Sequence, residues 1–101
     1  MKYLITARQR RSVPPEQAVS LFQAAREWLS AQLADGRLDC NYVFADTSGG
    51  CGILNADSHE EAFDTLLAHP LNPFFDWEIK ALCDWGHGID KVIEFYQKRI
   101  G

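Results

Sequence analysis

The feature that most constrains the fold is the order in which the hydrophobic period changes along the chain. Residues 2–9 are rich in β-branched and aromatic side chains and are followed by Val13-Pro14-Pro15, which predicts a strand and then a turn. Between Glu16 and Leu33 apolar side chains recur at three- and four-residue steps, which indicates an amphipathic helix that Asp35-Gly36 can end. The chain therefore begins with a strand followed by a helix.

The middle of the chain predicts a hairpin and a second helix. Residues 40–46 and 51–56 have the composition of strands, and the short segment 47–50 between them contains the glycines typical of a hairpin turn. Ser58 and Glu61 then form a capping box, in which the serine hydroxyl accepts from the amide of Glu61 while the carboxylate reaches back. The helix that this box begins ends before the next proline.

The last third predicts one more strand and one more helix. Residues 74–85 alternate apolar and polar side chains, which is typical of a strand, and Gly86-His87-Gly88 interrupts the pattern. Residues 88–100 then place an apolar stripe on one helical face, which could cover the sheet edge of its own chain or that of a neighbour. The stripe consists of Ile89, Val92, Ile93, Tyr96 and Ile100.

This order, β-α-β-β-α-β plus a helix, predicts a ferredoxin-like α+β fold with a four-stranded antiparallel sheet and both helices on one face. A chain of 101 residues makes a single domain, with a core over about 2–86 and a C-terminal helix over about 88–100. A chain this short does not enclose a deep cavity alone. We therefore expect the uncovered face of the sheet to pack against a second copy, which gives a homodimeric α/β barrel.

Composition excludes several classes of function. Fourteen acidic against 10 basic side chains give a net charge of −4, which disfavours nucleic acid, and the strand over 51–56 lacks the aromatic residues that stack on RNA. The three cysteines form no C-x-x-C pair and the histidines are scattered, which predicts reduced thiols in the cytoplasm and no metal site. No segment is long and apolar enough to span a membrane. We expect a cytoplasmic protein without nucleic-acid, membrane or metal partners.

The run from Glu61 to Cys83 resembles the second half of the muconolactone Δ-isomerases. A helix with an Asp-Thr-Leu step leads into Pro-Leu-x-Pro, an aromatic residue, Asp-x-Glu and Leu-Cys, in the same order and without a gap. The similarity extends more weakly over residues 18–86. It implies a dimeric ferredoxin-like barrel that assembles further, and a cofactor-free proton shift on a small unsaturated lactone acid of aromatic catabolism. It also implies a site that uses the first helix and the turn after the second strand, here residues 23–26 and 47–50.

Glu78 and Lys80 are the candidate catalytic residues. They lie two apart on one predicted strand and so point the same way, where they could act as a base and a cation beside a carbonyl in the barrel lumen. Arg8, Tyr42 and Asp46 could bind substrate in the same lumen. The alternative is a charge network across a dimer surface, and we favour it because alternating charges on strands are common without function.

The tryptophans allow two interpretations. Trp28, Trp77 and Trp85 could form an aromatic wall around a flat substrate. However, Trp28 lies in the apolar stripe of the first helix, and the other two lie on the strand face expected under the helices. Packing in the core is therefore the favoured interpretation.

Two hypotheses of function remain open. The first is a cofactor-free isomerase-type enzyme that transfers a proton within a small lactone or conjugated organic acid. The second is a non-catalytic, oligomeric small-ligand-binding or accessory protein of the same fold. The two differ in whether a bound lactone or acid is turned over.

Overall fold

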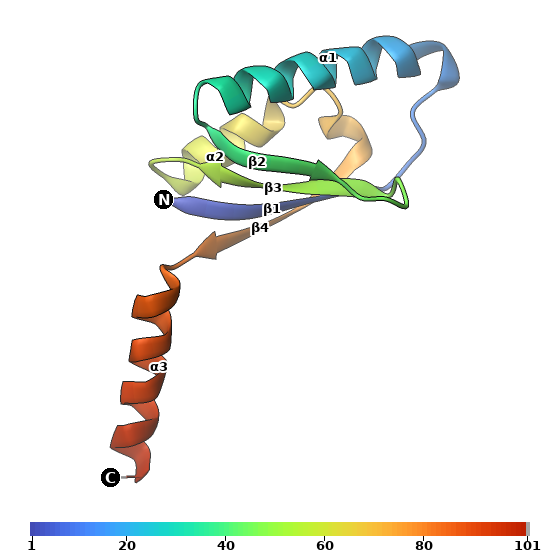
Figure 1. Ribbon diagram of the computed structural model, residues 1–101. Helices are drawn as coiled ribbons and strands as arrows, with labels where there is room; N and C mark the ends of the chain where they lie inside the picture. Colours follow the sequence, from blue (N-terminus) through green and yellow to red (C-terminus); the bar gives the residue numbers. More distant parts are fainter. Residues whose placement is uncertain (101) are drawn as a thin grey trace.

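The computed structural model describes residues 1–100 and shows the predicted α+β architecture. Its elements are β1 (Lys2–Gln9), α1 (Pro15–Ala34), β2 (Leu38–Val43), β3 (Gly49–Asn55), α2 (His59–Leu67), the short 3-10 helix η1 (Asn72–Phe74), β4 (Phe75–Leu82) and α3 (Trp85–Ile100). The strands form one antiparallel sheet in the order β2-β3-β1-β4, with α1 and α2 on one face (Figure 1). This order confirms the ferredoxin-like arrangement.

Local chemistry explains where the first two helices begin and end. Gly36 follows α1 with a φ of +81°, a left-handed conformation that glycine adopts without steric cost. At the start of α2 the Ser58 hydroxyl accepts from the Glu61 amide at 3.1 Å, as predicted. The Glu61 carboxylate in turn accepts from the Asp57 amide at 3.0 Å, one residue before the cap. The amides of Asp57 and Glu61 thus both have side-chain partners at this helix end.

The boundary between β4 and α3 differs from the sequence-based expectation. β4 ends at Leu82, and α3 begins at Trp85 rather than near residue 88. The Asp84 carboxylate accepts from the His87 amide at 3.1 Å, and its carbonyl accepts from the Gly88 amide at 2.9 Å. These bonds begin a helix where alternation predicted the end of a strand. The prediction that Trp85 faces the helices from β4 was therefore wrong, and its side chain is exposed.

The hydrophobic core lies between the centre of the sheet and α2. Tyr3 of β1 and Leu54 of β3 are almost fully buried and pack with Leu66 of α2. The buried Tyr3 hydroxyl lies 2.7 Å from Nδ1 of His59, so its polar end has a partner. Burial of each large apolar side chain contributes about 2 kcal/mol. This cluster fixes α2 on the sheet, whereas α1 contributes to it only through the partly buried Leu29.

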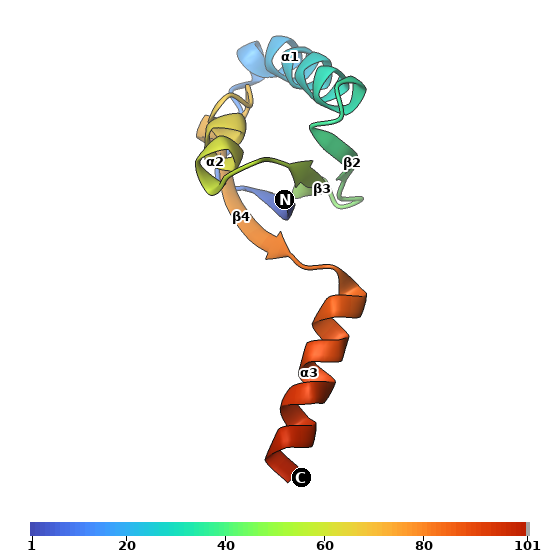
Figure 2. The same ribbon diagram turned by 90° about the vertical axis from the view of Figure 1, so that its left-hand side faces the viewer.

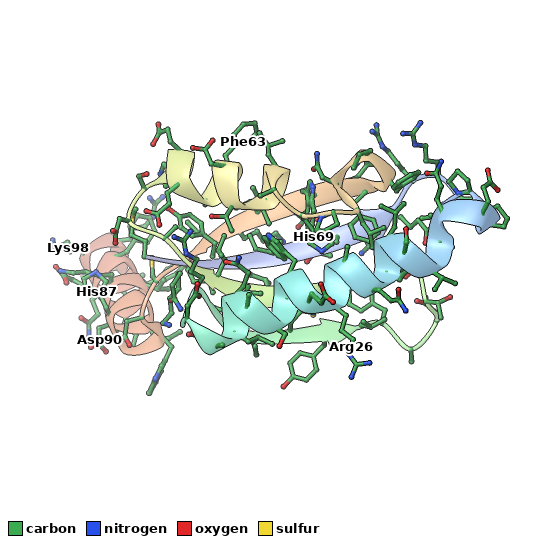
Figure 3. The ribbon with its side chains drawn as sticks, turned by 90° about the horizontal axis from the view of Figure 1, so that it is seen from above. Arg26, Phe63, His69, His87, Asp90 and Lys98 are labelled. Atoms are coloured by element: carbon green, nitrogen blue, oxygen red, sulfur yellow. The ribbon has the colours of Figure 1, made fainter. Side chains whose placement is uncertain are left out.

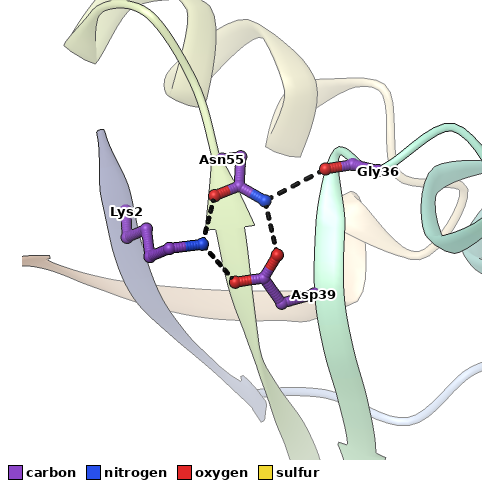
Figure 4. A network of polar contacts seen from close by, with 4 residues as sticks. All are labelled: Lys2, Gly36, Asp39 and Asn55. Carbon is purple, nitrogen blue, oxygen red and sulfur yellow. Dashed lines mark hydrogen bonds and ion pairs between the residues drawn. The ribbon is translucent and has the colours of Figure 1, made fainter.

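A polar network holds that end of α1 to the sheet (Figure 4). Lys2 donates to the carboxylate of Asp39 and, at 2.9 Å, to the side-chain oxygen of Asn55. The Asn55 amide donates to Asp39 at 2.7 Å and to the Gly36 carbonyl at 3.0 Å. The hydrogen bonds from Lys2 and Asn55 lower the pKa of Asp39. The network joins β1, β2 and β3 to the turn that follows α1.

The register of the sheet separates two faces. Tyr3, Ile5 and Ala7 of β1 are buried beneath the helices, so the alternate residues of β1 and their partners on β3 and β4 share the opposite side. We call this uncovered side the open face. It carries Leu4, Thr6, Arg8, Cys51, Ile53, Asp76, Glu78 and Lys80.

α3 projects away from the rest of the molecule on the side of the open face (Figures 1 and 2). The molecule consequently extends 64 Å along one axis but only 27 and 23 Å along the others. The predicted apolar stripe of α3 is exposed and does not cover the sheet edge of its own chain. In the part of the chain that the structure describes, no helix has the length and apolar character needed to cross a membrane.

Candidate functional site

A groove of about 760 Å³ lies between α1 and the helix-covered face of the sheet. Ala7, Gly50 and Gly52 line its floor, where they place a methyl group or no side chain at all. α1 lies over β2 and β3 on this side of the sheet (Figures 1 and 3). Because the floor residues are so small, they leave space that α1 does not fill. We call this space the α1 groove.

Aromatic rings from three segments form one wall of the α1 groove. The ring of His69 lies 4.9 Å from Trp28, 5.4 Å from Trp77 and 5.7 Å from Phe75, measured between centroids. The Trp77 indole donates to the Asn72 side chain at 2.7 Å, which fixes its orientation. Trp28 and Trp77 are half-buried and line the groove, and Trp77 also packs against the core. Trp77 therefore combines the two roles that the sequence allowed, a wall beside a ligand and packing in the core, and Trp28 contributes to the wall.

His69 is the most perturbed titratable group in the α1 groove. Its side chain is 8% exposed, and this burial lowers the pKa to about 4, so the ring is neutral near pH 7. Nδ1 accepts a hydrogen bond from the Leu71 amide at 3.0 Å, which places the proton of the neutral ring on Nε2. Within residues 1–100 the ring has this one hydrogen bond, at Nδ1, and Nε2 has no protein acceptor. His69 therefore offers a neutral N–H donor in apolar surroundings. Its side chain is labelled in Figure 3.

Polar groups lie toward the other side of the groove. Arg26 of α1 lies on the side of the helix away from α2 (Figure 3), and Thr47 contributes from the β2–β3 turn. Thr47 has a φ of +63°, which is unusual for a β-branched residue. The Asp46 carboxylate holds this turn by accepting from the Ser48 amide at 3.0 Å and from its hydroxyl at 2.6 Å. The two regions that the resemblance implied, the first helix and the turn after strand two, thus meet at one groove.

The groove is open along the edge formed by β2. The side chains on that side belong to both α1 and β2, and they line the groove while staying exposed to solvent. The other side is closed by the aromatic rings and the core. We call the exposed residues the groove rim: Phe22, Leu33 and Val43.

The predicted catalytic residues lie on the other face of the sheet. Glu78 and Lys80 form an ion pair at 3.0 Å on the open face, where both are exposed. They do not line the α1 groove. Their place in a lumen between two sheets therefore stays a prediction that depends on a second copy.

The predicted substrate-binding residues lie on the open-face side of the sheet or in the β2–β3 turn next to it. Arg8 lies on the open face beside Asp46, whose pKa is lowered mainly by the hydrogen bonds from Ser48 and further by the Arg8 charge. Tyr42 pairs with Cys51 in the β2–β3 register and so lies on the open-face side of the edge strand β2, while it also borders the groove. Within residues 1–100, no three or more His, Cys, Asp or Glu side chains gather in a way that could hold a metal ion.

Comparison with known proteins identifies the fold. No protein-family profile and no curated protein matches the chain. The crystal structure of muconolactone isomerase matches with a TM-score of 0.75 and 23% identity over 83% of this chain and 90% of that chain. The 5-chloro-2-hydroxyhydroquinone dehydrochlorinase from Burkholderia phenoliruptrix AC1100, in complex with 2,5-dihydroxybenzoquinone, matches with a TM-score of 0.64 and 18% identity over 86% and 98%. The chain therefore has the muconolactone isomerase fold, as the resemblance predicted.

Proposed function

We propose that the protein is a cofactor-free, isomerase-type enzyme that moves a proton within a small lactone or conjugated organic acid bound in the α1 groove. His69 carries this proposal, because it is a buried neutral imidazole with an N–H donor in an aromatic-lined groove. The groove volume of about 760 Å³ lies within the range of known small-molecule sites, about 300–1,000 Å³. That space accommodates a single-ring compound with its substituents.

The chemistry explains why such a donor is useful. Moving a double bond beside a carbonyl requires removal of a proton from one carbon and its return to another, and negative charge develops on the carbonyl oxygen between these steps. A fixed donor in apolar surroundings stabilises that charge more than water does. Because the pKa of His69 is about 4, its ring stays neutral and acts by hydrogen bonding from Nε2 rather than as the acid.

The groove also favours a particular shape of ligand. Trp28 and Trp77 present ring surfaces that suit a flat molecule, and Arg26 lies where a guanidinium could pair with a carboxylate. The similar structures support this choice, since one is named for a lactone and the other was solved with a quinone. Lactones and quinones are both small ring compounds with carbonyl oxygens.

The groove itself provides no carboxylate base to remove the proton. Among residues 1–100 its lining contains no Asp or Glu side chain. Glu78, with Lys80 beside it, would supply a base if the reaction takes place in a lumen between two open faces. The lack of a carboxylate favours one second candidate, a small-ligand-binding protein of the same fold without catalysis.

We also propose that the protein is a homodimer or larger homo-oligomer that pairs through the open face. Leu4 and Ile53 lie opposite each other at its centre, where they are half-buried in the single chain. Charges of both signs surround them, including the Glu78–Lys80 pair. A two-fold axis can bring opposite charges of such a surface together.

Thermal melting against a panel of small lactones, phenolic acids and keto acids, followed by an ultraviolet assay of each hit, tests the function. His69→Gln should lower turnover of a hit by about 100-fold while the protein still binds it. His87→Gln, a control at an exposed position on α3, should leave turnover unchanged.

The same assay separates the alternatives. Turnover that survives His69→Gln but is lost in Glu78→Gln would move the reaction to the lumen of the dimer. Saturable binding without turnover of any compound in the panel would favour the ligand-binding protein. If no compound raises the melting temperature, the proposed ligand class is wrong.

A further inference from the structure

Asn41 of β2 places a polar side chain in the α1 groove. The register pairs it with Gly52, and both lie with Ile5 of β1 on the helix-covered face of the sheet. The side-chain oxygen of Asn41 lies 3.0 Å from the position that a Cβ of Gly52 would occupy. The glycine therefore leaves the space in which the Asn41 amide lies over the floor of the groove.

The Asn41 amide has no hydrogen-bond partner within residues 1–100. Asn55 and Asn72, in contrast, both hold other segments of the fold through their side chains. Gln9 is the other amide side chain that the described strands contribute to the groove, and it donates to the Arg11 carbonyl at 3.0 Å. Asparagine is also uncommon in strands. Neither the strand nor its neighbours therefore give a structural reason for an amide at this half-buried position.

Asn41 and His69 lie diagonally across the groove. His69 packs against Trp77 of β4, whereas Asn41 lies on β2, at the opposite edge of the sheet. Three strand spacings of about 4.8 Å separate these strands, which is about 14 Å between their backbones. A six-membered ring that carries oxygens on two opposite carbons, with a hydrogen bond of about 2.9 Å at each end, fits within this width. One ligand can thus contact both side chains.

The two side chains offer different hydrogen bonds. His69 presents an N–H donor, which suits a carbonyl oxygen. A primary amide has both a donor and an acceptor, and a hydroxyl group can use both. An aliphatic substituent placed against the amide would remove it from water without replacing its hydrogen bonds, which weakens binding. Apolar groove residues such as Leu29 and Leu54 surround this contact and strengthen its effect.

We propose that Asn41 determines specificity in the α1 groove by binding a hydroxyl group of the ligand, on the side opposite the oxygen that accepts from His69. The inference deepens the proposed function and rests on the groove as the ligand site. It narrows the ligand class to ring compounds with a carbonyl at one end and a hydroxyl at the other. The neutral Asn41 amide selects the ligand and does not move the proton.

Isothermal titration calorimetry with two matched probes tests the assignment. The probes 4-hydroxyacetophenone and 4-methylacetophenone share the ring and the ketone, and they differ in a hydroxyl and a methyl group of similar size. Asn41→Leu keeps the shape of the side chain without its polar atoms. It should lower the preference for the hydroxyl probe over the methyl probe at least about 10-fold. His69→Gln should weaken both probes to a similar extent, because both carry the ketone.

A matched control makes the same amide-to-leucine change away from the groove. Gln97 lies at an exposed position on α3, so Gln97→Leu should leave the preference between the probes unchanged. NMR of the side-chain amides gives a second readout on the wild-type protein. The Asn41 signal, assigned by its absence from the Asn41→Leu spectrum, should shift on titration with the hydroxyl probe. The Asn55 amide, which is held by Asp39 and the Gly36 carbonyl, is the internal reference.

The outcomes separate this inference from the proposed function. An equal preference in wild type and Asn41→Leu, or an Asn41 signal that does not move at saturation, would overturn the inference. Binding of neither probe would also overturn it, and turnover of another compound would then leave the proposed function standing. If Asn41→Leu loses the preference in a protein that turns over no lactone or acid, the specificity role stands and the proposed catalysis alone fails.

Discussion

Lowering the pH from 7.5 to 5.0 should destabilise the protein by about 2 kcal/mol through His69 alone. In the unfolded chain this histidine has an ordinary pKa of about 6.5 and takes up a proton over the range. In the folded chain burial holds the pKa at about 4, so the ring stays neutral. Because the unfolded state binds more protons, the free energy of unfolding falls as the pH falls from about 6.5 toward 4.

The magnitude follows from the difference between the two pKa values. A gap of about 2.5 units corresponds to about 3 kcal/mol, of which about 2 kcal/mol is lost by pH 5.0, before most carboxylates protonate. The structure shows a reason beyond burial for the neutral ring. Nδ1 accepts from the Leu71 amide at 3.0 Å, and a protonated Nδ1 would lose that bond and set two donors against each other.

Urea denaturation followed by tryptophan fluorescence at several pH values measures the effect, with one protein concentration throughout because the proposed dimerisation would also change apparent stability. The comparison is with His69→Gln, whose amide does not titrate. His59 and His87 are present in both proteins, so their contributions cancel in the difference. The wild type should lose about 2 kcal/mol more than the variant between pH 7.5 and 5.0. Equal losses in the two proteins would refute the reasoning.

Two further predictions concern the sheet. Gly50→Ala should cost about 1–3 kcal/mol in urea denaturation, because a Cβ there would lie 2.5 Å from the backbone oxygen of Tyr42 and would displace β2. Gly88→Ala, whose Cβ meets nothing within 4 Å, is the control and should not lower stability. Lys2→Met should raise the pKa of Asp39, since the hydrogen bond from Lys2 is the main cause of its low value. An unchanged carboxyl titration by NMR would contradict the network in Figure 4.

The element order was predictable because each element begins or ends with local chemistry. Ser58 and Gly36 act through bonds to residues no more than a few positions away, so the sequence contains the whole interaction. The end of β4 was not predictable in this way. Cys83 and Trp85 continue the apolar alternation of a strand, while Asp84 offers a helix cap. Alternation alone does not rank these two options, and the bonds from Asp84 to the first turn of α3 decide between them.

In the candidate site, too, some features were predictable from local spacing and others were not. Period-two spacing correctly placed Glu78 and Lys80 on one face, where they pair. The α1 groove depends instead on the absence of side chains at the glycines of β3 beneath α1. His69 was not selected as a functional residue because its chemistry arises between segments: the Leu71 amide fixes its tautomer, and rings from α1 and β4 bury it. The sequence feature that could have pointed to His69 was its position between a predicted helix and a strand rich in aromatic residues.

The open side of the groove connects the proposed chemistry to assembly. A hydrogen bond from His69 stabilises charge strongly only where water is excluded, since the interaction weakens as the effective dielectric constant rises. In one chain the groove rim admits water along β2, and none of the elements within residues 1–100 covers that side. If a second copy that pairs through the open face also covers this edge, dissociation of the dimer exposes two grooves to water at once. Turnover per chain should then fall on dilution at the concentration where the dimer dissociates, and a tethered dimer should keep its activity.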